Sequence, residues 1–228
     1  MSKSEHRKQK MYLDHRYKLG KPTMRHIFSI CALALIVNFA SPISVVANQP
    51  ASHKDQAIAT VENLHDTLLE VMRDASTLGF NGRVEKLDPV LAESFDFMTI
   101  ARIVTGKHWK NIDESQRTTF IDTFAKLSSA TYASNFSGFS GEQFKTTGVD
   151  EKRGKYVVRT LIVKSDGEEI SLDYIVTEKD GVLRIVNVIA AGVSDLSLKR
   201  ADYTAVINSE GFDSLLARLD DKINNLGR

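Results

Sequence analysis

Residues 156–190 read YVVRTLIVKSDGEEISLDYIVTEKDGVLRIVNVIA, and this stretch decides the fold class. Three runs rich in β-branched and aromatic residues are separated by two Asp-Gly pairs. The runs are 156–164, 170–177 and 182–190, and the pairs are Asp166-Gly167 and Asp180-Gly181. An Asp-Gly pair between apolar runs is typical of a β-hairpin, because both residues tolerate the backbone of its tight turn. The stretch therefore predicts an antiparallel meander, to which residues 143–149 add a fourth strand.

Helical periodicity precedes these strands. Apolar residues recur three or four positions apart through residues 55–77, which predicts an amphipathic helix. Residues 79–82, GFNG, are expected to end it. A short helical stretch is expected over residues 83–87. Asp88 is then placed to cap another short helix that has Pro89 in its first turn, and Asp96 to cap the helix behind it.

A longer helix follows, and helical spacing returns after the strands. Asp113 and Gln116 have the spacing of a capping box, and the helix behind them is expected to end near residues 138–141. Residues 194–228 are again helical in period, with a break at Gly211. Helices, then strands, then helices predict an α+β fold with helices packed on one antiparallel sheet.

The N-terminus has the three parts of a secretory signal. Residues 1–26 carry eight Lys or Arg and two acidic residues, residues 27–40 are uncharged and largely apolar, and Ala47 ends a small-residue segment. We therefore expect residues 1–47 to be a cleavable signal peptide, cut after Ala47, and residues 48–228 to be one domain in the periplasm. The alternative is an uncleaved anchor over residues 27–47, which is near the length that spans a bilayer.

Charge and cysteine content of the expected mature chain exclude several classes of protein. Removing eight of the 30 basic and two of the 29 acidic residues leaves 22 and 27, a net charge of −5. A mildly acidic surface argues against nucleic acid as a partner, since phosphates require basic patches. Cys31 is the one cysteine of the chain and lies in the signal, so the mature domain is expected to have no disulfide.

A search for catalytic motifs gives little. His53, His65 and His108 are not spaced as metal ligands, and the expected mature chain has no thiol to serve as a nucleophile. No phosphate-binding glycine loop is present. We therefore expect neither an enzyme nor a metal or cofactor site. If the protein is an enzyme, Asp173 and His108 are the remaining candidates for catalytic residues.

Five short segments, in order, carry a family resemblance. They are residues 95–109 (FDFMTIARIVTGKHW), Ser115-Gln116-Arg117 with the helix behind it through 131–133 (TYA), 140–142 (SGE), 188–194 (VIAAGVS) and 211–215 (GFDSL). This series resembles the toluene-tolerance/MlaC family of periplasmic lipid-binding proteins and extends over about residues 55–225. Residues 195–197 (DLS) depart from the pattern, since many relatives are more apolar there.

The resemblance implies a curved antiparallel sheet of about four strands wrapped by N-terminal and C-terminal helices (NTF2-like or MlaC-like). It implies a monomeric carrier that holds a phospholipid or other membrane lipid in an apolar cleft. The carrier would exchange lipid with an inner-membrane ABC transporter complex and an outer-membrane lipoprotein complex. Three alternatives stay open: a hopanoid-related lipid as cargo, a cone-fold enzyme that acts on an apolar small molecule, and an anchored assembly factor.

The family resemblance, together with the face of the helix or strand on which each residue lies, gives candidate contacts for the lipid. The expected acyl-chain contacts are Ile103, Trp109, Phe120, Phe124, Tyr132, Val158, Leu172, Tyr174 and Val188. Arg102 and Arg159 are the candidates for a head-group partner. Each apolar candidate has a competing interpretation, because a large apolar side chain in a helix or strand is often part of the core.

Overall fold

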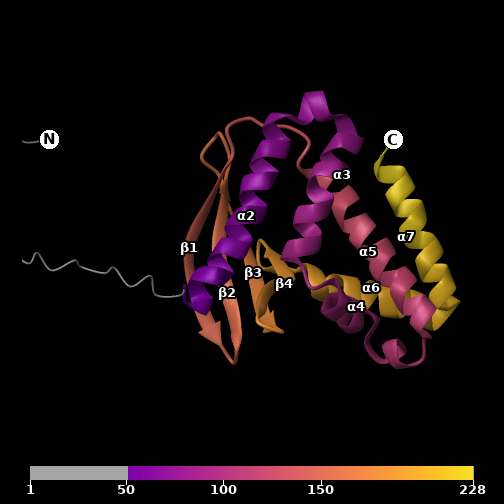
Figure 1. The fold of residues 1–228 in the computed structure, drawn as a ribbon. Helices are drawn as coiled ribbons and strands as arrows, with labels where there is room; N and C mark the ends of the chain where they lie inside the picture. Colours follow the sequence, from indigo (N-terminus) through magenta and orange to yellow (C-terminus); the bar gives the residue numbers. More distant parts are fainter. Residues whose placement is uncertain (1–50, 228) are drawn as a thin grey trace, which may run out of the picture. The chain divides into compact units, whose positions relative to one another are not determined.

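The structure is a computed structural model that describes residues 51–227 (Figure 1). The predicted signal segment therefore lies outside the described residues. Five helical elements come first: α2 (His53–Arg73), α3 (Ala75–Ser94), α4 (Phe97–Thr105), the 3-10 helix η1 (Gly106–Lys110) and α5 (Glu114–Asn135). Strands β1 (Gln143–Lys152), β2 (Lys155–Val163), β3 (Glu169–Lys179), β4 (Val182–Ala190) and β5 (Val193–Ser194) follow, then α6 (Asp195–Glu210) and α7 (Phe212–Leu226). The predicted α+β class and order of elements are confirmed.

The sheet is an antiparallel meander in the order β1-β2-β3-β4-β5. Asp180 and Gly181 have φ values of 54° and 76° and join paired Lys179 and Val182, which is the two-residue hairpin that the Asp-Gly pair predicted. Two connections were not predicted. A second tight hairpin at Arg153 and Gly154 extends β1 to Lys152, and Ala191-Gly192 leads into the short β5.

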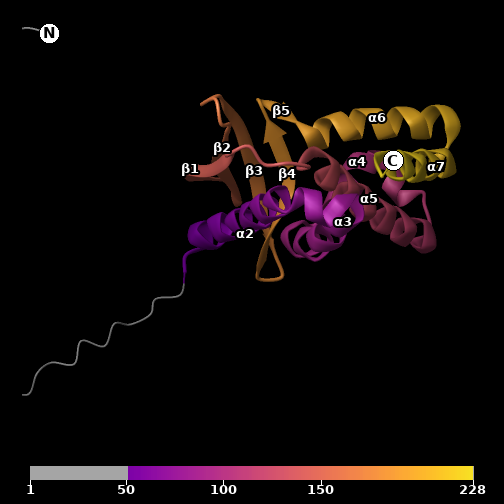
Figure 2. The ribbon, with the colours of Figure 1, turned by 90° about the horizontal axis from the view of Figure 1, so that it is seen from above.

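One face of the sheet forms the core with the helices. Leu172, Tyr174 and Val176 alternate along β3 and are all buried. Helix α2 packs against β1, β2 and β4, while α3, α4 and α6 each contact β4. Figures 1 and 2 show α4, α5, α6 and α7 grouped beside the β4 end of the sheet. The space between this group and the strands is where the candidate site lies.

Helix α3 corrects the prediction for residues 79–94. The first helix, α2, ends at Arg73 and not at residues 79–82. Gly79, at φ 60° and ψ −173°, interrupts α3 instead, and one continuous helical segment then runs through Pro89 to Ser94. Asp88 is not a cap: its carboxylate accepts a hydrogen bond from the Ser129 hydroxyl on α5. Pro89 removes one backbone donor from the helix, and burial of Leu87 and Leu91 on either side favours the helix nonetheless.

The cap of α4 yields a stability prediction. The buried Asp96 carboxylate accepts the Thr99 backbone N–H at 2.9 Å and the Thr99 hydroxyl at 2.6 Å. Asp96→Ala is expected to lower the free energy of unfolding by about 1–2 kcal/mol, measured by urea denaturation. Asp74→Ala is the matched control, because Asp74 precedes α3 without any side-chain capping bond. Equal losses in both variants would contradict a specific role for the Asp96 cap.

Candidate functional site

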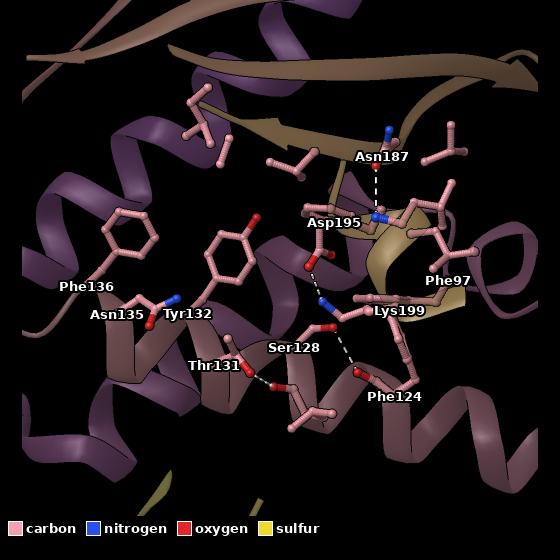
Figure 3. Close-up of a pocket in the computed structure, with 18 of the residues that line it drawn as sticks. Phe97, Phe124, Ser128, Thr131, Tyr132, Asn135, Phe136, Asn187, Asp195 and Lys199 are labelled. Atoms are coloured by element: carbon pink, nitrogen blue, oxygen red, sulfur yellow. Dashed lines mark hydrogen bonds and ion pairs between the residues drawn. The ribbon is translucent and has the colours of Figure 1, made fainter. Parts of the chain in front are cut away.

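A cavity of about 330 Å³ lies between α4, α5, the start of α6 and the inner face of the sheet (Figure 3). Most of its lining is apolar and comes from elements far apart in the sequence. The apolar and aromatic lining residues are Phe95, Phe97, Ile100, Phe124, Leu127, Tyr132, Phe136, Ile162, Leu172, Val186, Val188, Ala190 and Leu196. The polar ones are Ser128, Thr131, Asn135, Asn187, Asp195 and Lys199.

Periodicity explains how two walls of the cavity form. Phe124, Leu127, Thr131 and Tyr132 are three, four and one residues apart, so they share one side of α5. On the sheet, Leu172 pairs with Ala190 across β3 and β4, and cross-strand partners lie on the same face. Ala190 is small and adds little side-chain volume to this wall of the cavity.

The polar groups of the cavity are few and well defined. Figure 3 shows the Tyr132 hydroxyl pointing from α5 into the cavity, where it makes no hydrogen bond to any of residues 51–227. Burial raises the pKa of Tyr132, and the nearby Asp195 carboxylate raises it further, so this phenol stays protonated. Asp195 and Lys199 form an ion pair along the first turns of α6.

Asn187 joins the strand wall to α6. Its side-chain oxygen accepts the Leu196 backbone N–H at 3.1 Å and the Ser194 hydroxyl at 3.2 Å. These bonds fix where α6 begins relative to β4, and therefore where Asp195 and Lys199 stand at the cavity. Asn187 itself is 8% exposed, so these bonds are largely shielded from solvent.

The structure brings together four of the nine predicted apolar contacts: Phe124, Tyr132, Leu172 and Val188 all line the cavity. Phe120, Val158 and Tyr174 do not line it, because each is fully buried in the core. Phe120 packs against Tyr203 of α6 and Phe212 of α7, and the Tyr174 hydroxyl bonds to His65 on α2.

The other predicted residues lie elsewhere. Ile103, Trp109 and Arg102 line a second hollow between α4, η1 and α6, together with Lys110 and Arg200. Arg159 is exposed on β2, and its guanidinium donates to the Asp150 carboxylate on β1 at 2.9 Å. Neither arginine therefore stands at the cavity.

The residues that sequence reasoning missed had weak signals. Asn187 is a polar residue inside the apolar run of β4, and Asp195 and Lys199 have the spacing of an ion pair on one helix turn. Each pattern is common on ordinary surfaces. Only the packing of α6 beside β4 and α5 places them at one cavity.

The two candidate catalytic residues do not reach the cavity. Asp173 accepts a long hydrogen bond from the Thr160 backbone, and neither Asp173 nor His108 lines the cavity. Within residues 51–227, no cluster of His, Cys, Asp and Glu could hold a metal ion. No helix in the same range is both long and apolar enough to cross a bilayer.

The family model described as MlaC protein matches residues 62–221, most of the chain. The chain belongs to the MlaC family. The resemblance of its five motifs is thereby confirmed. An MlaC protein of Haemophilus influenzae, named an intermembrane phospholipid transport system binding protein, is 24% identical over 121 residues. That match covers 51% of the chain and 56% of the relative, so the chain spans about half the length of this MlaC protein.

A solved structure has the same fold. The phospholipid-binding protein of Ralstonia solanacearum, determined in complex with a phospholipid, superposes with a TM-score of 0.68 at 21% sequence identity. The match covers 76% of the chain and 99% of the Ralstonia chain. Both proteins are named for binding and not for catalysis, which agrees with the expectation that this MlaC-family chain is not an enzyme.

Proposed function

We propose that this protein binds a phospholipid with its acyl chains in the cavity between α5, α6 and the sheet, and carries it between membranes. The observation that carries the proposal is the cavity itself. Its lining is mainly apolar, and its few polar groups come from α5, β4 and α6. Membership of the MlaC family and the lipid-bound Ralstonia structure support the same cargo.

The physical chemistry suits such a task. Each methylene that moves from water to an apolar site gains about 0.8 kcal/mol, so a sixteen-carbon chain faces on the order of 10 kcal/mol against crossing water unprotected. A protein cleft that takes the chain from one apolar environment to another removes that barrier. The free energy of transfer between membrane and protein is then near zero, which permits both loading and release.

Loading requires the cavity to widen. Its volume of about 330 Å³ lies near the lower end of the range of small-molecule pockets, and a phospholipid with two chains is larger than such ligands. We infer that α5 and α6 move apart from the sheet when lipid enters. Lipid binding then stabilises the open form by a free energy that grows with the logarithm of the ratio of lipid concentration to Kd.

The place of action follows from the N-terminal segment and the family. We propose that residues 1–47 direct export, that cleavage leaves Asn48 as the first residue, and that the mature carrier works in the periplasm as a monomer. An outer-membrane lipoprotein complex and an inner-membrane ABC transporter complex are the proposed partners for lipid exchange.

The first test is the lipid content of the protein. The mature domain is purified from bacterial cells without detergent, extracted with organic solvent and analysed by mass spectrometry. We expect about one phospholipid per chain, and uptake of phospholipid from vesicles by protein that has been stripped of lipid. Absence of both would contradict the proposal. A hopanoid as the main extracted lipid would change the proposed cargo but leave the proposed carrier function in place.

A second measurement tests export. Sequencing the N-terminus of the protein recovered from periplasmic extracts is expected to begin at Asn48. A first residue before residue 27 in a membrane fraction would show a retained anchor and contradict cleavage.

A further inference from the structure

The cavity presents one negative and one positive side chain. Of the residues that line it, Asp195 and Lys199 alone carry charge, and both stand on the first turns of α6. The Lys199 side chain is 27% exposed and the Asp195 side chain 54% exposed, so both groups can reach a ligand from the rim. Figure 3 shows the pair facing the part of α5 that carries Ser128 and Tyr132.

We propose that Asp195 and Lys199 form a head-group subsite for a zwitterionic phospholipid, in which Lys199 binds the phosphate and Asp195 the ammonium. The inference rests on the proposed phospholipid carrier and goes beyond it by naming the head group. Without ligand the two side chains neutralise each other. A zwitterion inserted between them replaces one ion pair by two, so no charge is left without a partner.

Other polar groups of the cavity can assist the pair. The Tyr132 hydroxyl lies near Asp195, makes no hydrogen bond within residues 51–227, and can donate to an ester carbonyl of the lipid. The Ser128 and Thr131 hydroxyls instead donate to carbonyls of their own helix at 2.9 Å and 2.7 Å. Their oxygens therefore remain as acceptors, which suit an ammonium group.

An anionic head group without an ammonium cannot pair with both side chains. Its phosphate can still pair with Lys199, but the Asp195 carboxylate then loses its counter-charge and stands close to a second negative charge. Like charges at such separations repel, and the repulsion is stronger at a partly buried site than in bulk water. The subsite therefore selects for phosphatidylethanolamine over phosphatidylglycerol.

The test is a competition for uptake from mixed vesicles. Mature protein stripped of lipid is incubated with vesicles of phosphatidylethanolamine and phosphatidylglycerol in equal amounts and with identical acyl chains. The bound lipids are then quantified by mass spectrometry. We expect wild-type protein to carry about five-fold more phosphatidylethanolamine than phosphatidylglycerol. Asp195→Asn is expected to bring this ratio close to one, while Lys199→Gln lowers uptake of both lipids.

Asp202→Asn is the matched control, because it removes the same charge from an exposed position of the same helix, outside the cavity. It is expected to keep the wild-type ratio. Wild-type protein that carries lipid at the ratio of the vesicles, or Asp195→Asn protein that keeps the wild-type preference, would overturn the subsite and leave the carrier intact. Wild-type protein that carries no lipid would overturn the carrier itself. Thermal unfolding of each variant shows that the fold is retained.

Discussion

Thr131→Trp is expected to reduce the lipid content of the purified protein at least about ten-fold, because an indole would fill much of the cavity. Thr131 lines the cavity from α5, and its hydroxyl bonds within the same helix, to the Leu127 carbonyl. The substitution therefore breaks no hydrogen bond to another element. Mass spectrometry of solvent extracts, normalised to protein, measures the effect.

Thr118→Trp provides the matched control. Thr118 lies on the same helix, makes the same type of hydrogen bond to the carbonyl four residues earlier, and is exposed outside the cavity. It is expected to keep the wild-type lipid content. If Thr131→Trp protein is folded by circular dichroism and still carries a full complement of phospholipid, the acyl chains do not occupy this cavity.

Local signals predicted the sheet well and the first helices less well. The two Asp-Gly pairs predicted both central hairpins, because Asp and Gly tolerate positive φ at a tight turn. The hairpin at Arg153 and Gly154 was missed because arginine rarely adopts its φ of 54°. Asp88-Pro89 predicts the start of a new helix, whereas packing of the residues around Pro89 keeps α3 continuous.

Periodicity assigned side chains to faces but could not say how deep each would lie. Phe120 and Phe124 are four residues apart on one side of α5, and both were predicted to contact lipid. Phe120 meets Phe212 of α7 and is sealed in the core, while Phe124 reaches the cavity. The difference depends on where α7 crosses α5, which is a contact between segments about 90 residues apart in sequence.

The head-group candidates show the same limit. Arg102 and Arg159 are the predicted head-group partners, and neither is at the cavity. The cation that is there, Lys199, belongs to a helix whose position depends on the bonds from Asn187 to Ser194 and Leu196. A side-chain contact that sets the start of a helix has no signature in local periodicity.

The core beneath the cavity holds a histidine that should make stability depend on pH. His65 on α2 is 3% exposed, its Nε2 lies 2.9 Å from the Tyr174 hydroxyl, and its ring stacks on Phe144 at 4.1 Å. Burial lowers the pKa of His65 from 6.5 to about 4. The folded protein therefore holds this ring neutral under conditions in which the unfolded chain would protonate it.

This stabilisation is fully present above pH 6.5 and is lost as the pH falls toward 4, because only the unfolded chain binds the proton in that window. The shift corresponds to about 3 kcal/mol over the whole window. Urea denaturation at a series of pH values measures the loss, and His65→Gln, which can still bond to Tyr174 but cannot titrate, is expected to flatten the slope. His53→Gln changes an exposed histidine and should leave the slope unchanged. Identical pH profiles for wild-type and His65→Gln protein would show that His65 is protonated in the folded core without a penalty, and that the apolar packing around it is open to water.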